Sequence, residues 1–203
     1  MSSSRTYHSP AREAKAAATR QAILEAFRDQ LLDPGRDSLS PTDAAEAAGC
    51  SVRTVHGHFP TGESRIEALA ELLDTEVYAD GPPQPSSADD LAEHYRTIHR
   101  AALASPLAEA LVTQPGEFRK VRSHRRSTRL EAVRRVVADI GAPPAPTDDA
   151  TAVLLALAGA EVAIHMRDEA GLGHDRIPGA IADTVELIVA DLRRAAAVAE
   201  GAR

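Results

Sequence analysis

The sequence predicts an all-α protein with an N-terminal three-helix helix-turn-helix domain and a C-terminal helical bundle, about nine helices in total. Apolar residues recur at helical spacing through most of the chain. The 203 residues include 13 prolines and 12 glycines, which divide the chain into separate helical segments. Residues 40–59, SPTDAAEAAGCSVRTVHGHF, have the pattern of two short helices joined by a tight turn.

The signals that begin and end these two short helices are local. Ser40 is a good N-cap, and Pro41 follows at the first helical position, where its missing N–H costs nothing. Gly49 supplies the left-handed backbone conformation that ends the first helix. Ser51 then caps the second helix, which we expect over residues 52–58.

The other helices follow from apolar residues spaced three and four apart between clusters of breakers. They are expected at about 11–31, 63–79, 88–104, 106–113, 116–140, 148–169 and 177–199. The cluster 81–87, GPPQPSS, is the strongest breaker. We expect an N-terminal helix-turn-helix domain at 1–62 and a C-terminal helical domain at 63–203, with the helix at 63–79 as the connector.

Polar side chains of the second short helix can donate hydrogen bonds to bases or phosphates. Arg53 is the best candidate to read a guanine edge, and Val52 can touch a thymine methyl. The candidate DNA-binding residues are Ser40, Thr42, Ser51, Val52, Arg53, Thr54, His56 and His58. The alternative is an ordinary solvated surface, because residues 1–60 balance at seven basic and seven acidic residues and the whole chain carries −7.

The stretch resembles the DNA-binding domain of the TetR family of transcriptional regulators. The matching residues are Ser40, Ala44-Ala45, Ala48-Gly49-Cys50-Ser51 and His56-Gly57-His58-Phe59, with Ile23, Ala26, Phe27 and Leu31 before them and Ile66, Leu69 and Leu73 after. The match covers about residues 19–75. Two positions depart from it: His56 stands where the family carries a phosphate-binding tyrosine, and Gly62 where it carries a lysine.

The resemblance implies a dimer that binds palindromic double-stranded DNA and is released by a small-molecule effector, most often as a repressor. It also implies that residues 1–62 form the DNA-binding domain and that residues 63–203 form the ligand-binding and dimerisation domain. The last two helices, the eighth and ninth in the predicted order, would then form the dimer interface. A different class stays open, namely a helical ligand-binding or protein-interaction module whose DNA-reading head is degenerate. The absent lysine at Gly62 and the acidic charge balance favour that alternative.

The predicted helix at 148–169 is nearly all apolar before Glu161. Its apolar circumference exceeds one buried stripe, so a second copy of the chain is expected to cover part of it. The alternative is a central helix in a monomeric bundle.

Residues 119–135 contain eight lysines and arginines and one acid, Glu131. One helical stripe of this region is apolar at both ends and runs through Phe118, Arg122, Arg125, Arg129, Ala132, Val136 and Ile140. Some of its arginines can therefore point inward, where they need a carboxylate or an anionic ligand. We expect an effector pocket between the helices at 88–104, 116–140 and 148–169. Its candidate residues are Tyr95, His99, Arg125, Arg129, Glu161 and His165. Internal salt bridges and a second nucleic-acid surface are the alternatives.

Several classes of protein are disfavoured. Glu161 and His165 could chelate a metal, but two ligands are too few, so no metal or cofactor is expected. No nucleophile–base set, phosphate loop or zinc motif is present, which argues against an enzyme. One cysteine, the lack of a signal peptide and a longest apolar run of only 152–160 predict a cytoplasmic protein with no membrane partner.

Overall fold

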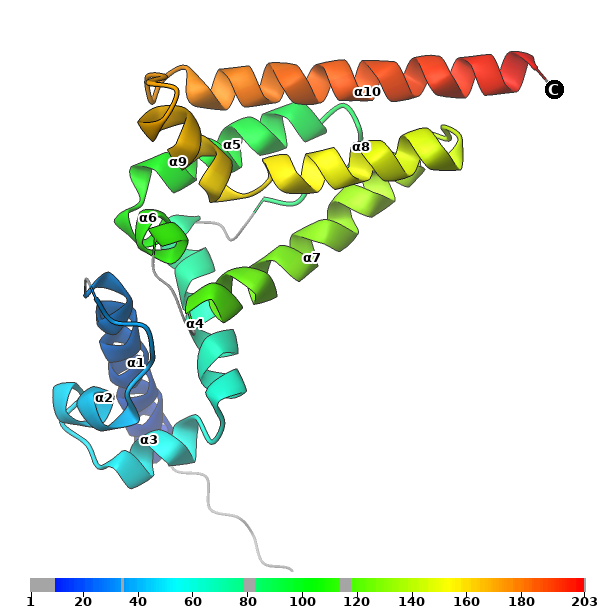
Figure 1. The fold of residues 1–203 in the computed structure, drawn as a ribbon. Helices are drawn as coiled ribbons and strands as arrows, with labels where there is room; N and C mark the ends of the chain where they lie inside the picture. The colour runs from blue at the N-terminus through cyan, green and yellow to red at the C-terminus, as the bar shows by residue number, and fades with distance from the viewer. Residues whose placement is uncertain (1–9, 34, 79–82, 114–117, 203) are drawn as a thin grey trace, which may run out of the picture.

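The computed structural model describes residues 10–33, 35–78, 83–113 and 118–202. These residues form α-helices and contain no strand, so the predicted all-α class is confirmed. The helices are α1 (Pro10–Leu32), α2 (Pro41–Ala47), α3 (Val52–His58), α4 (Gly62–Val77), α5 (Leu91–Ala104), α6 (Pro106–Thr113), α7 (Phe118–Ala138), α8 (Pro144–Leu157), α9 (Ala160–Asp168) and α10 (Ile177–Gly201). In Figure 1, α1–α3 form a small group at one end, α4 rises from it, and α5–α10 form the larger body.

The helix-turn-helix is built by the caps that the sequence predicts. The Ser40 hydroxyl accepts a hydrogen bond from the Asp43 N–H at 3.2 Å, and the Ser51 hydroxyl accepts one from the Thr54 N–H at 3.1 Å. Gly49 has φ +62°, the left-handed conformation that reverses the chain between α2 and α3.

The N-terminal helices pack around an apolar core that continues into the larger body. Phe27 of α1 meets Phe59 edge-on, with 6.0 Å between the ring centroids, and both are buried. Leu69 of α4 belongs to the same core, as do Leu111 of α6 and Val121 of α7. Because α4 and α6 share this core, α1–α3 do not stand alone. The boundary between residues 62 and 63 stays a prediction.

The larger body is organised around α10. This helix packs along α5 and also touches α8 and α9, while α7 runs from α4 to α8 (Figure 1). Tyr95, Leu154, Ile181 and Val185 are buried in its core. Of the predicted breaker cluster, residues 83–87 form no helix, and 81–82 lie outside the described residues.

The single helix predicted over residues 148–169 is wrong. The segment forms α8, which begins earlier with Pro144 at its first position, and α9, and the two helix axes differ by 63°. Gly159 is the N-cap of α9, with extended backbone angles of φ −77° and ψ 138°. Glycine has a low helix propensity, and here the Glu161 carboxylate folds into the space that a side chain at residue 159 would occupy.

Within the described ranges, no single helix is long and apolar enough to cross a bilayer. The helices α8 and α9 would meet the length and composition only when they are taken together across their bend.

Candidate nucleic-acid interface and ligand cavity

The outer face of α3 carries the main candidates for contact with DNA. Val55 and Phe59 are 0% and 1% exposed and anchor the helix to the core. Arg53 precedes Val55 by two residues, so the helical period turns it to the opposite, exposed side. Val52 is 37% exposed and His56 is exposed as well. The helix therefore presents an arginine, an apolar group and an imidazole outward.

Arg53 differs in its electrostatic environment from two other arginines of the N-terminal helices and their loops. Arg36 donates to Asp43 at 2.7 Å, and Arg28 donates to Glu76 at 3.0 Å. The hydrogen bond from Arg36 stabilises the carboxylate of Asp43 and lowers its pKa. Arg53 makes no hydrogen bond or ion pair with any residue that the structure describes. Its charge is therefore available to an external anion.

The other predicted DNA-binding residues have mixed surroundings. Ser40 and Ser51 are helix caps, and the Ser51 hydroxyl also lies 2.8 Å from that of Thr54. Thr42 is exposed, whereas His58 is half-buried. Contact of these eight residues with DNA stays a prediction.

The start of α4 is where the TetR resemblance would place a lysine. The residue there is Gly62. Thr61 and Ser64 cap the helix reciprocally: the Thr61 hydroxyl accepts from the Ser64 N–H at 3.0 Å, and the Ser64 hydroxyl accepts from the Thr61 N–H at 3.2 Å. The first turn carries an acid, Glu63, which suits the helix dipole and repels phosphate. This position therefore provides no cationic side chain to replace the lysine.

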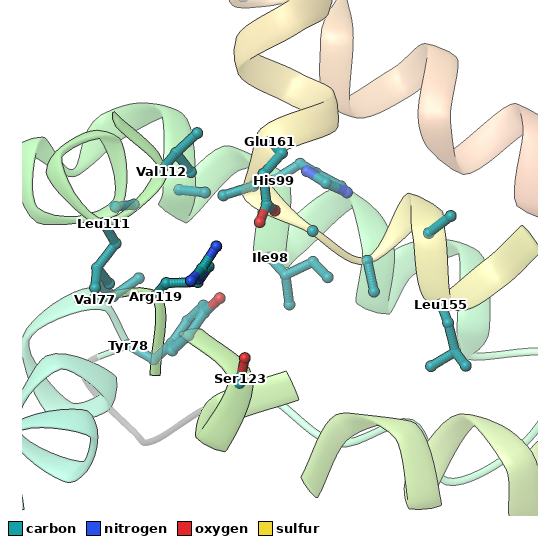
Figure 2. A pocket seen from close by; sticks show the side chains of 16 residues that line it. Val77, Tyr78, Ile98, His99, Leu111, Val112, Arg119, Ser123, Leu155 and Glu161 are labelled. Atoms are coloured by element: carbon teal, nitrogen blue, oxygen red, sulfur yellow. The ribbon is translucent and has the colours of Figure 1, made fainter. Parts of the chain in front are cut away.

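A cavity of about 460 Å³ opens between the C-terminal end of α4, helices α5, α6 and α7, and the α8–α9 break. Its polar lining residues are Tyr78, His99, Arg119, Ser123 and Glu161. Its apolar lining residues are Val77, Ile98, Ala102, Ala108, Leu111, Val112, Leu155, Ala156, Ala158 and Ala160, with Gly159 at the break. Figure 2 shows the Arg119 guanidinium and the Glu161 carboxylate pointing toward the same space from opposite walls. This volume is within the range of about 300–1,000 Å³ that holds small molecules.

Tyr95 and His99 hydrogen-bond to backbone carbonyls at the C-terminal end of α8, where the chain bends before α9. The Tyr95 hydroxyl donates to the Leu154 carbonyl at 2.5 Å, and the ring Nε2 of His99 lies 2.7 Å from the Leu157 carbonyl. Because a carbonyl can only accept, that nitrogen carries the proton. Tyr95 is fully buried and does not line the cavity, whereas His99 both supports the break and lines it.

The structure brings only part of the predicted pocket together. Glu161 and His99 line the cavity, but the side chain of His165 is 62% exposed and lies away from it. The Nδ1 atom of His165 bonds instead to the backbone carbonyl of Glu161 at 2.7 Å. Arg125 and Arg129 lie on α7, with side chains outside the described residues.

Sequence reasoning missed Arg119 as a cavity residue. The predicted stripe along α7 runs through Phe118 and Arg122. Around the helix, Phe118 lies about 100° from Arg119 and Arg122 lies about 60° from it, so the stripe does not include Arg119. The usable signal was the spacing of four between Arg119 and Ser123, which places both on one face, and the structure shows that this face lines the cavity.

Across the described residues, no group of three histidine, cysteine, aspartate or glutamate side chains is placed to hold a metal ion. Glu161 and His165 meet through a backbone carbonyl and not as two side-chain ligands.

Comparison with known proteins places this geometry in a wider context. No family model matches the chain, and no curated protein matches its sequence. Two solved structures share its fold. The native NalD of Pseudomonas aeruginosa, the secondary repressor of the MexAB-OprM multidrug efflux pump, aligns with a TM-score of 0.57 and 19% identity over 84% of this chain and 95% of that one.

The second similar structure is a transcriptional regulator from Rhodococcus sp. Rha1, with a TM-score of 0.56 and 19% identity over 86% of this chain and 97% of that one. Each alignment leaves out less than a fifth of this chain. The chain therefore shares the fold of these two transcriptional regulators, an all-helical fold of the kind that the resemblance of its helix-turn-helix residues implied.

Proposed function

We propose that this chain is a ligand-responsive transcriptional regulator of the TetR type that acts as a repressor. In this proposal a homodimer binds palindromic operator DNA and releases it when a small molecule occupies the cavity. The observation that carries the proposal is Arg53, an exposed arginine without a partner among the described residues, on the outward face of the second helix of a capped helix-turn-helix. The fold shared with two transcriptional regulators, one of them a repressor, supports the same class.

The position of α4 supports a response to ligand. Its residues Ile66, Leu69 and Leu73 pack in the core beneath the helix-turn-helix, while Val77 at its other end lines the cavity. A ligand that fits one position of Val77 better than another would favour one position of α4, and with it one position of α2 and α3. The difference in ligand affinity between the two states sets how far operator binding is weakened.

Exposed apolar side chains on α8 and α10 support a homodimer. Val153 on α8 is 48% exposed, and Leu187 and Val198 on α10 are 70% and 74% exposed. The two helices pack against one another, so they offer neighbouring surfaces for a second copy. A two-fold dimer places its recognition helices about 34–36 Å apart, one turn of DNA, and binds a palindrome.

The test is selection of a binding site from a library of random DNA duplexes, followed by affinity measurements over a range of salt concentrations. The selected site should be palindromic, and affinity should fall steeply with salt because phosphate contacts release counterions. Arg53→Ala should weaken binding by roughly 5- to 150-fold, the equivalent of 1–3 kcal/mol. Arg134→Ala, which removes an exposed arginine on α7, is the matched control and should bind like the parent.

The competing function is a ligand-binding or protein-interaction module that does not bind DNA. Gly62 and Glu63 at the start of α4 favour it, because the position of the expected phosphate contact carries no cation. Failure to enrich any duplex, with ligand binding intact, would support this module over the regulator.

A further inference from the structure

Two charged side chains line the cavity, Glu161 and Arg119, and they differ in their interactions with the rest of the protein. Glu161 already interacts with other groups of the protein. Arg119 makes no hydrogen bond or ion pair with any described residue, although its guanidinium points into the cavity (Figure 2). Of these two lining residues, Arg119 is therefore the one whose charge has no partner among the described residues.

The wall around Arg119 adds hydrogen-bond donors to this charge. Ser123 lies one helical turn further along α7 and lines the same cavity, and Tyr78 contributes a hydroxyl from just after α4. An acidic group placed at Arg119 would therefore meet a guanidinium and hydroxyl donors together. Hydrogen bonds between ionised partners are roughly twice as strong as those between neutral groups.

The remainder of the cavity is apolar. Ile98, Leu111 and Leu155 come from three different helices and face the space beside the polar wall. Apolar surface of this kind favours a ligand with a hydrocarbon or aromatic body through the hydrophobic effect. The Glu161 carboxylate on the opposite wall disfavours a second negative charge.

We infer that the cavity binds an apolar monoanion, with its acidic group at Arg119 and Ser123 and its body against Ile98, Leu111 and Leu155. The inference rests on the proposed function only in assigning the regulatory ligand to this cavity, and it names the chemical class of that ligand. Dianions such as phosphate monoesters are disfavoured by Glu161, and neutral apolar molecules lack the group that Arg119 would pair with.

Two fluorescent probes that share one anilinonaphthalene body test this inference in the full-length protein. The first is 1-anilinonaphthalene-8-sulfonate, an apolar monoanion, and the second is N-phenyl-1-naphthylamine, which lacks the sulfonate. The parent protein should bind the sulfonate more tightly than the neutral probe. Arg119→Met should weaken sulfonate binding by roughly tenfold or more, because it removes a charge-assisted hydrogen bond, and should change the neutral probe by less than about twofold.

Two further variants make the result decisive. Arg134→Met removes an exposed arginine from the same helix and should leave both probes unchanged. Ser123→Trp fills the cavity and should abolish binding of both probes. Unchanged sulfonate affinity in Arg119→Met, or sulfonate binding that survives in Ser123→Trp, would overturn the inference.

The same variants separate this inference from the proposed function. Operator binding is measured without any probe, and Arg119→Met should retain it because the residue lies on α7, away from α3. If the protein binds DNA but does not prefer the sulfonate, the proposed regulatory function stands and the inferred ligand class is wrong. If the protein prefers the sulfonate but selects no duplex, the inferred ligand class stands and the proposed regulatory function is wrong.

Discussion

The hydroxyl of Tyr95 is bonded to a carbonyl of α8 in a fully buried position outside the cavity. From the sequence alone, this residue was a candidate to touch a ligand, because a polar aromatic ring on an inward helical face serves either purpose. The structure gives the hydroxyl a partner in the fold. Its contribution is therefore to stability and to the position of the α8–α9 break.

We predict that Tyr95→Phe lowers the free energy of unfolding by about 1 kcal/mol, which corresponds to a fall in Tm of about 2–4 °C. The Leu154 carbonyl keeps its helical partner, the Ala158 N–H at 3.0 Å, so the loss should not exceed this value. Binding of the sulfonate probe should not change, because Tyr95 does not line the cavity. Thermal unfolding and probe titration on one preparation measure both quantities. Unchanged stability together with weaker probe binding would show that Tyr95 contacts the ligand.

Asp43 stabilises the turn before α2 in two ways: its carboxylate accepts a hydrogen bond from Arg36, and its backbone N–H donates one to the hydroxyl of the Ser40 cap. The bond from Arg36 is the largest cause of its lowered pKa. A carboxyl group whose pKa is lower in the folded state stabilises the fold above its unfolded pKa, and this contribution disappears as the pH falls through the folded pKa.

We therefore expect Asp43→Asn to be less stable than the parent at pH 6 and to approach it as the pH falls below about 4. Urea unfolding between pH 6 and pH 3 measures the difference. The pair is largely exposed, so the effect should be small and should shrink further in high salt. A difference that stays constant across this range would show that the carboxylate charge does not stabilise the turn.

At the scale of helices, α2 and α3 could be predicted from the sequence because their boundaries depend on local chemistry. Ser40, Gly49 and Ser51 act within a few residues of themselves, so neither packing nor distant contacts had to be known. The break between α8 and α9 could not be predicted in the same way. Leu157 and Ala158 precede Gly159 and Ala160 follows it, and a single glycine in such an apolar run is compatible with a continuous helix.

The cavity depends on that break and was therefore only partly predictable. Glu161 and His99 both line the cavity, and they meet there because of the bend. Arg119 was missed because the phase of α7 is set by packing against α4 and α8 and not by its own strongly basic sequence. A helix with basic residues on all sides gives little indication of which side faces inward.

We predict that Gly159→Ala folds with a stability within about 1 kcal/mol of the parent but alters the cavity. The extended backbone at residue 159 is open to alanine, and the clash of the new methyl group is with the flexible end of Glu161. The carboxylate must then move from its place over the break. Thermal unfolding should be nearly unchanged while the affinity of the sulfonate probe changes.

Gly179→Ala is the matched control, because a methyl group there meets open space on α10. It should leave probe binding unaltered. A large loss of stability in Gly159→Ala alone would mean that the break requires glycine itself and does not depend only on the position of Glu161.

At the scale of the whole molecule, the apolar side chains left exposed on α8 and α10 are the feature that a monomer does not explain. Scattered exposed apolar residues are normal, but here Leu187 and Val198 occupy the longest helix, and Val153 lies on its neighbour. Burial of these side chains in a dimer would remove them from water and fix the distance between two reading helices. DNA affinity should therefore depend on the dimer even though α10 lies far from α3 (Figure 1).

Leu187→Arg should accordingly weaken the dimer by about 2 kcal/mol or more, roughly 30-fold, because a charge would enter a buried apolar interface. Sedimentation velocity over a concentration series measures the shift toward monomer, and affinity for the selected palindrome should fall in parallel. Leu32→Arg is the control, since Leu32 is an exposed leucine of α1 outside both helices, at 41% exposure. It should leave the oligomeric state unchanged. If Leu187→Arg and the parent sediment alike and bind the palindrome equally, then α10 does not join two copies, and each chain must reach its half-site independently.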